Sequence, residues 1–192
     1  MNKVVVVRPG STAFDEQERM KGCLDIPLSP AGVIQVQRAA NEVARFPIAA
    51  VYCGPCESAQ ATARQIAETA RCKVKVCDCF RNLDHGLWQG KCIDDIKRQQ
   101  PKLFKQVQDN PRAFNPPGGE TIADAELRVS KQLQKLQKKH VNETIAVVIP
   151  EPMATLVASK LKSVDFEDLW DSECDDGSWE IIGDNSTSAR AS

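Results

Sequence analysis

The sequence has no excess of charge of either sign and no long apolar run. It carries 25 basic and 26 acidic side chains among 192 residues, which gives a net charge of −1. That balance excludes the basic footprint of a nucleic-acid-binding protein and the polybasic patch of a membrane-surface protein. No apolar stretch is long enough to span a bilayer, and no charged segment followed by an apolar one marks an export signal. We therefore expect a cytoplasmic protein without nucleic-acid or membrane partners.

Histidine is scarce, with only His85 and His140, whereas cysteine is abundant at eight residues. Cys53 and Cys56 have the two-residue gap of a zinc knuckle, but neither a second Cys-x-x-Cys pair nor a histidine pair follows. A tetrahedral zinc site needs four ligands at defined spacings, so we expect no metal and no other cofactor. Without an export signal, we expect reduced and mostly buried thiols rather than disulfides.

The N-terminal stretch 3–10 reads Lys-Val-Val-Val-Val-Arg-Pro-Gly. Four consecutive valines fit a strand that is buried on both faces, as in the middle of a parallel sheet. The Pro9-Gly10 pair then predicts a turn. Ligands of open α/β sheets bind beyond the carboxyl ends of the strands, so Arg8 is placed where an anionic ligand would sit.

Strand-like and helix-like patterns alternate along the rest of the chain, which predicts a mostly parallel sheet with right-handed crossovers. After a loop over 11–28, Ser29-Pro30 gives the clearest helix start, with serine as the N-cap. Val33, Val36, Ala40 and Val43 follow at helical spacing and predict the face that packs on the sheet. Further strands are expected at 49–53, 74–77, 144–149 and 178–182, the last antiparallel at the edge. Further helices are expected at 57–70, from 121 to at least 136, and at 152–162.

The stretch 91–120 interrupts this alternation. Its helical pattern over 94–107 is broken by Pro101, and a loop rich in proline and glycine follows. We expect this stretch to lie over the strand ends as a lid-like insertion within a single domain of residues 1–183. The small and polar residues 184–192 predict a disordered tail. The lysines between 131 and 139 indicate a solvated helix face.

Five short blocks succeed one another along the chain. They are Arg-Pro-Gly at 8–10 with Thr12, Arg19, Gly22 and Pro27-Leu28-Ser29; Tyr-Cys-Gly-Pro-Cys-Glu-Ser-Ala from 52; Phe-Arg-Asn from 80 with Gly-Leu-Trp-Gln-Gly from 86; Pro-Gly-Gly-Glu-Thr from 117; and Ile-Pro-Glu from 149. In this order they resemble the histidine phosphatase superfamily, the phosphoglycerate mutase-like group. The resemblance implies a three-layer α/β/α sandwich with a mostly parallel central sheet.

The sequence departs from the residues that this resemblance implies for phosphoryl transfer. Pro9 stands where the family has the histidine that forms phosphohistidine, and it has no side-chain nitrogen. Asn82 stands for the glutamate that protonates the leaving group, and an amide gives up no proton near neutral pH. Of the groups that clamp the phosphate, Arg8 remains, but Ser58 stands for the second arginine and Pro150 for the second histidine.

Two additional carboxylates are expected close to this site. Glu151 replaces the glycine that follows the second histidine of the family, and Glu57 lies just before the position of the second arginine. We hypothesise that Arg8 pairs with Glu151 or Glu57, which makes the pocket self-neutralised. The loss of two clamping groups costs roughly 3–6 kcal/mol of phosphate binding, about two to four orders of magnitude in affinity. Arg8, Arg19 and Glu120 are the candidate ligand-binding residues that remain.

The expected function is therefore that of a catalytically inactive protein of this family, acting as a binding or scaffold module for a protein or small-molecule partner. Two alternatives stay open. One is a phosphatase-like hydrolase with a changed mechanism that uses Cys56, Cys53 or His85. The other is a non-catalytic sensor that binds a phosphorylated metabolite through Arg8.

Overall fold

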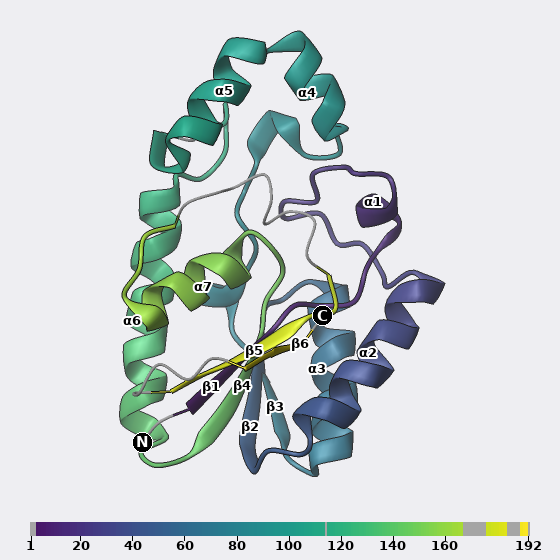
Figure 1. The fold of residues 1–192 in the computed structure, drawn as a ribbon, viewed down its shortest axis with the longest axis vertical. Helices are drawn as coiled ribbons and strands as arrows, with labels where there is room; N and C mark the ends of the chain where they lie inside the picture. The colour runs from purple at the N-terminus through teal and green to yellow at the C-terminus, as the bar shows by residue number, and fades with distance from the viewer. Residues whose placement is uncertain (1–2, 114, 167–175, 184–188, 192) are drawn as a thin grey trace.

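The computed structural model describes residues 3–113, 115–166, 176–183 and 189–191 (Figure 1). Within these residues, six strands form one sheet in the order β3-β2-β4-β1-β5-β6. The strands are β1 (Lys3–Val7), β2 (Ile48–Cys53), β3 (Lys73–Val76), β4 (Thr144–Val148), β5 (Trp179–Gly183) and β6 (Ala189–Ala191). The first four in chain order are mutually parallel, and β5 runs antiparallel to β1. The prediction of a mostly parallel sheet is confirmed.

Helices cover both faces of the sheet, so the fold is the three-layer α/β/α sandwich that was expected (Figure 1). The helices α2 (Pro30–Val43) and α3 (Glu57–Ala70) pack on one face, and α6 (Ile122–Lys139) and α7 (Met153–Lys162) pack on the other. The valines of β1 alternate between the two resulting cores, since Val4 and Val6 join one and Val5 and Val7 the other. All four valines are buried, which confirms the strand buried on both faces.

Helix α2 begins as predicted, but its buried face is rotated from the prediction. The Ser29 hydroxyl accepts a hydrogen bond from the Gly32 backbone N–H at 3.0 Å, and Pro30 occupies the first turn. Val33, which was expected to face the sheet, is 53% exposed. Gly32 is buried against the loop instead. It lies so close to Ser11 that a Cβ at this position would be only 2.0 Å from the Ser11 carbonyl oxygen. Only glycine permits this approach of helix and loop.

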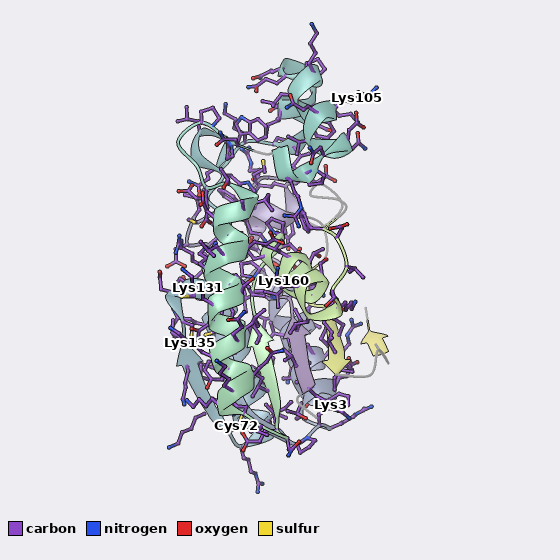
Figure 2. The ribbon with its side chains drawn as sticks, turned by 90° about the vertical axis from the view of Figure 1, so that its left-hand side faces the viewer. Lys3, Cys72, Lys105, Lys131, Lys135 and Lys160 are labelled. Atoms are coloured by element: carbon purple, nitrogen blue, oxygen red, sulfur yellow. The ribbon has the colours of Figure 1, made fainter. Side chains whose placement is uncertain are left out.

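The remaining helices follow the prediction closely, with additions in the loops. Helix α3 has the expected bounds, and the Thr121 hydroxyl caps α6 by accepting from the Asp124 backbone N–H. Figure 2 shows Lys131 and Lys135 on the outward face of α6, and both are exposed, so that face is solvated as expected. The predicted loop 11–28 contains one short helix, α1 (Ala13–Glu16), which Thr12 and Asp15 close as a capping box. Short 3-10 helices lie at Asp78–Phe80 (η1), Gly86–Trp88 (η2) and Pro111–Ala113 (η3).

The interrupted stretch folds into two helices, α4 (Ile93–Gln99) and α5 (Pro101–Asp109). Pro101 takes the first turn of α5, where its missing N–H costs nothing, so the proline starts a helix as well as ending one. Figure 1 shows both helices at the end of the molecule beyond α1 and the start of α6. Their role as a lid stays a prediction.

The expected disordered tail is wrong for residues 189–191, which form β6. This strand pairs antiparallel with β5, with Trp179 opposite Ala191 and Ile181 opposite Ala189. The free edge of β5 offers backbone N–H and C=O groups that any extended segment can pair with, whatever its side chains. The rest of the predicted tail, 184–188 and 192, lies outside the described residues. None of the helices that the structure describes is both long enough and apolar enough to cross a bilayer.

Candidate functional site

The loops that follow β1, β2 and β4 meet at one edge of the sheet, because parallel strands end on the same side. Their first residues are joined by backbone hydrogen bonds, from Ile149 N–H to the Val7 carbonyl at 3.0 Å and from Gly54 N–H to the Val148 carbonyl at 3.1 Å. Arg8 is therefore brought beside the loop that carries Pro150 and Glu151. Site residues far apart in sequence share this edge, as the pattern of strands predicted.

The Arg8 guanidinium is bonded to carboxylates of the chain itself. Its Nε donates to Glu151 Oε1, and its Nη2 lies 3.3 Å from Glu180 Oε1 and 3.4 Å from Thr155 Oγ1. Arg8, Glu151 and Glu180 are all at least 96% buried. The pairing of Arg8 with Glu151 agrees with the hypothesis, whereas the side chain of Glu57 is exposed.

Among the residues that the structure describes, Arg8, Lys162, Glu151 and Glu180 form a cluster of two basic and two acidic side chains, called the Arg8 cluster below. Lys162 Nζ bonds to the second carboxylate oxygen of Glu180, so each acidic side chain has a basic partner. Burial raises the pKa of Glu151 to about 7, and the opposing effects of the Arg8 charge and of hydrogen bonds from Arg8 and Thr155 hold it from rising further. The Thr155 backbone N–H donates to Glu151 Oε2 at 3.0 Å, and its hydroxyl donates to Oε1 at 2.9 Å.

Sequence reasoning did not find Glu180. The available signal was its place in Trp-Glu-Ile-Ile, a lone carboxylate within a strand that is otherwise apolar. All of 179–182 is buried, and a buried carboxylate needs a cation or hydrogen-bond donors. A buried partner could therefore have been inferred, although not that the partner is Arg8.

The residues that replace the second arginine and the two histidines sit within the protein interior. Pro9, Pro150 and Ser58 are all buried. The Pro9 carbonyl accepts from the Gly177 N–H at 2.8 Å, and the Pro150 carbonyl accepts from the Ala154 N–H at 3.0 Å. The Ser58 hydroxyl lies 3.7 Å from Cys56 Sγ. These side chains provide neither a cation nor an imidazole nitrogen.

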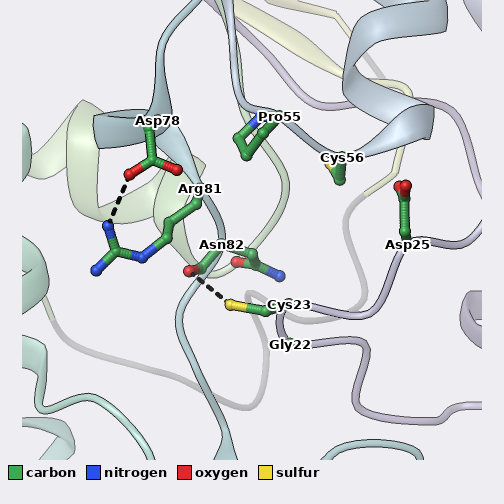
Figure 3. Close-up of a pocket in the computed structure, with 8 residues that line it drawn as sticks. All are labelled: Gly22, Cys23, Asp25, Pro55, Cys56, Asp78, Arg81 and Asn82. Carbon is green, nitrogen blue, oxygen red and sulfur yellow. Dashed lines mark hydrogen bonds and ion pairs between the residues drawn. The ribbon is translucent and has the colours of Figure 1, made fainter.

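A cavity of about 230 Å³ lies between the loops that follow β2 and β3 and the loop that contains residues 22–25, and we call it the Asn82 pocket (Figure 3). It is lined by Gly22, Cys23, Asp25, Pro55, Cys56, Asp78, Arg81 and Asn82. The Asn82 side chain is buried, and its Oδ1 accepts from the Leu83 backbone N–H at 2.9 Å. Its amide nitrogen has no hydrogen-bond partner among the described residues. Figure 3 shows that nitrogen turned toward the space between Cys23, Cys56 and Asp25.

The N-terminus of α3 borders this pocket and is already capped. Cys56 is the N-cap residue, but its side chain makes no capping hydrogen bond to the helix backbone. Asp25 takes that role from a distant loop, since its Oδ1 accepts from the Glu57 backbone N–H at 2.5 Å. A helix N-terminus attracts anions, and here the anion is a carboxylate of the chain.

The candidate ligand-binding residues Arg19 and Glu120 hold loops together. Arg19 Nη1 donates to the Gly90 carbonyl at 2.7 Å. Glu120 accepts two hydrogen bonds from Arg128, at 2.7 and 2.8 Å, and one from Arg81 at 3.2 Å. Arg128 also donates to the carbonyls of residues 79, 81 and 82, so it fixes the segment that carries Asn82. Sequence reasoning missed Arg128, because nothing in a helix pattern distinguishes it from a surface arginine.

The side chains considered for a changed mechanism are differently placed. Cys53 is fully buried at the end of β2, and burial raises its pKa to about 12. Cys56 lines the Asn82 pocket, and His85 is fully buried just before η2. The cysteines of the described chain are free thiols. Among the residues described, no three His, Cys, Asp or Glu side chains are grouped as a metal ion would require.

Comparisons with known proteins agree on one family. A model of the histidine phosphatase superfamily (branch 1) matches residues 4–190. Phosphoserine phosphatase 1 of Hydrogenobacter thermophilus is 29% identical over 182 residues, which cover 95% of this chain and 86% of that protein. Phosphoglycerate mutase-like protein 4 of Arabidopsis thaliana is 30% identical over 149 residues, which cover 76% of this chain and 65% of that protein. The structure of YhfR from Bacillus stearothermophilus superposes with a TM-score of 0.85 at 24% identity and covers 100% of this chain and 96% of that one.

Proposed function

The chain belongs to the histidine phosphatase superfamily (branch 1), and we propose that it is a catalytically inactive member that acts as a binding or scaffold module. The module takes a protein or small-molecule partner at the mouth of the former active site. Relatives of this chain are named as phosphatases, so the proposal depends on the site positions at which the residues of this chain differ from the family pattern.

One observation carries the proposal, the occupation of Arg8 by two carboxylates of the chain. A phosphate bound at Arg8 would have to displace Glu151 or lie against Glu151 and Glu180 in a buried site. Like charges in such a site repel strongly, because little water is present to screen them. Glu151 and Glu180 therefore give Arg8 the negatively charged partner that a bound phosphate would give it in a relative with both arginines.

The groups that would carry out the chemistry support the same proposal. Pro9 has no imidazole nitrogen to take up a phosphoryl group, and the Asn82 amide does not release a proton to a leaving group near neutral pH. Among the alternative nucleophiles, Cys53 is disfavoured because a thiol whose burial raises its pKa to about 12 is protonated at neutral pH. A phosphate sensor that acts through Arg8 is disfavoured by the same ion pairs that carry the proposal.

The test is phosphate release from a panel of phosphomonoesters at high protein concentration, with a control that contains no protein. We expect no release above the control. Turnover that is abolished by Cys56→Ser would overturn the proposal in favour of a relocated nucleophile. Turnover that is abolished by Arg8→Met, in a variant whose circular dichroism shows that it is folded, would overturn it in favour of a phosphate site that works without the histidine. Turnover that no substitution changes, with Cys53 and His85 also replaced, comes from a contaminating phosphatase, which a further purification step removes.

A further inference from the structure

Strand β3 forms one edge of the sheet, and among the described strands it pairs only with β2. The Cys77 backbone N–H, directly after β3, donates to the Cys53 carbonyl of β2 at 2.9 Å. Backbone groups point to alternate sides along a strand, so the N–H and C=O groups of Val74 and Val76 point away from β2. Within the described chain no other backbone group bonds to them. An extended peptide can add a strand at an open edge of this kind.

Both lysines of β3 lie on the face of the sheet that α6 covers. Lys75 Nζ lies 5.7 Å from the centre of the Tyr52 ring, which belongs to the core between the sheet and α6. Lys73 precedes Lys75 by two residues, so its side chain is on the same face. Val74 and Val76 face the opposite side, where Val74 packs against the core and Val76 is 52% exposed. The edge strand therefore presents a charged row on one face and an apolar row on the other.

Helix α6 adds lysines beside the charged row. Lys139 Nζ lies 6.0 Å from the centre of the Tyr52 ring, and Gln132 Nε2 lies 3.6 Å from Cys77 Sγ. Positions 132 and 139 are two turns apart on one face of the helix, so this face is directed toward β3, and Lys135 lies on it between them. Figure 2 shows Lys135 on the exposed surface of α6. The β3 edge surface is defined here as the open edge of β3 with Lys73, Lys75, Lys135 and Lys139.

The four lysines of the β3 edge surface are exposed and carry no counter-charge. None of them forms an ion pair within the part of the chain that the structure describes. The carboxylates close to them in sequence, Asp78 and Glu143, are bonded to Arg81 and His140 instead. The chain as a whole has a net charge of −1, so this group of cations is a local feature. A surface of this kind attracts a partner of opposite charge.

The combination of lysines and an open edge selects among possible partners. Lysines on an edge strand protect it against pairing with a second copy, because the lysines of the two copies would face one another. They do not protect it against a strand with carboxylates at the matching positions, since opposite charges across a strand pair stabilise it. A nucleic acid would contact the lysines but would leave the backbone groups of the edge and the exposed Val76 unused. The surface therefore fits an acidic peptide best.

We propose that the β3 edge surface binds an extended acidic segment of a partner protein. The segment adds a strand to the sheet through backbone hydrogen bonds to Val74 and Val76. Its acidic side chains occupy every second position, on the face of the four lysines, and its apolar side chains lie between them on the face of Val76. No residue of this surface belongs to the Arg8 cluster or lines the Asn82 pocket, so binding here is independent of whether the chain is catalytically active.

The test uses four probes that are titrated into the ¹⁵N-labelled protein at low salt. The first is a capped peptide with the alternating sequence Glu-Val-Glu-Val-Glu, and the second is the same peptide N-methylated at its three central residues. The third replaces each glutamate with lysine, and the fourth is a single-stranded oligonucleotide of thymidines. We expect the acidic peptide to bind, to slow hydrogen exchange of the Val74 and Val76 amides, and to dissociate at high salt. N-methylation should weaken it more than about tenfold, and the other two probes should not slow exchange at these amides.

Charge reversals on the protein test the lysines one at a time. Lys75→Glu and Lys135→Glu should each weaken the acidic peptide about fivefold, because an attraction between exposed charges becomes a repulsion. Lys75→Glu should also strengthen binding of the lysine peptide, which a structural role of Lys75 would not produce. Lys105→Glu, at an exposed position of α5 far from Lys135 in Figure 2, is the matched control and should change neither peptide.

Each contrary result overturns the proposed interaction and leaves the proposed function unaffected. One such result is an acidic peptide that does not bind, or that binds without slowing exchange at Val74 and Val76. Equal affinity of the N-methylated peptide would show a purely electrostatic contact. Tighter binding of the oligonucleotide would assign the lysines to nucleic acid. A stable dimer at low salt that Lys75→Glu does not change, and that blocks the acidic peptide, would assign the edge to a second copy of this chain.

Discussion

Replacing Arg8 with methionine leaves Glu151 and Glu180 buried with Lys162 as their only counter-charge in the Arg8 cluster. Removing one partner of a buried ion pair costs about 3–5 kcal/mol of folding free energy, because the other charge stays buried without compensation. Glu151→Met removes the opposite charge and should cost a similar amount. The double variant Arg8→Met/Glu151→Met again balances the cluster, as the Lys162–Glu180 pair, and should be far more stable than the sum of the two costs implies.

The assay is urea unfolding of the four proteins of this double-mutant cycle at a pH above 7, where the Glu151 carboxyl is ionised. We expect a coupling free energy of about 3 kcal/mol between Arg8 and Glu151, at the upper end for residues in contact. The matched control is the exposed pair Arg112–Glu126, whose bonds of 2.8 and 3.0 Å look as good but whose arginine side chain is 47% exposed. Its coupling should be about 0.2–1 kcal/mol. A coupling below about 0.5 kcal/mol for Arg8 and Glu151 would refute the reasoning, because the two charges would then be independent.

Three further predictions concern Glu151, Cys53 and Arg128. Because burial raises the pKa of Glu151 from 4.5 to about 7, the folded state binds more protons between these values, so stability should fall as the pH rises through this window and level off above it. Glu151→Gln should remove that slope from urea midpoints measured across the window, and an unchanged slope would assign it to another group. Cys53, with its pKa raised to about 12, should react with iodoacetamide only after unfolding, as followed by mass spectrometry; rapid labelling of the native protein would contradict its burial. Arg128→Met should lower the free energy of unfolding by about 3 kcal/mol, since it removes two of the three hydrogen bonds that Glu120 accepts and the arginine donor of three carbonyls, and a loss below 1 kcal/mol would show that Arg128 is not needed to fix the segment of Asn82.

The sheet and its main helices could be predicted from the sequence because their signals are local. Four valines in a row identify a strand buried on both faces, and Ser29-Pro30 identifies a helix start, without knowledge of any other part of the chain. The orientation of α2 could not be predicted in the same way. Val33 fits the helical stripe as well as Val36 does, and only the close approach of the Ser11 carbonyl to Gly32 selects the face that is buried.

The site was predicted only in part, for a related reason. A carboxylate next to the position of the second histidine made Glu151 a candidate partner for Arg8, because the family resemblance places both at one edge of the sheet. Glu180 pairs with Arg8 across 172 positions of the sequence, from a strand whose antiparallel register determines which residue faces Arg8. Arg128 likewise depends on a contact between a helix and a distant loop. Such partners depend on how distant elements pack together, and no local pattern in the sequence indicates which residues will meet.

The central claim is that the phosphate position at Arg8 is occupied by the chain itself. The most direct measurement is a crystal structure of the protein grown or soaked in concentrated orthovanadate or sulfate. The account predicts that Arg8 remains bonded to Glu151 and Glu180, with no anion within hydrogen-bond distance of its guanidinium. An anion bound to Arg8, with Glu151 turned away, would contradict it and restore this edge of the sheet as a phosphate site.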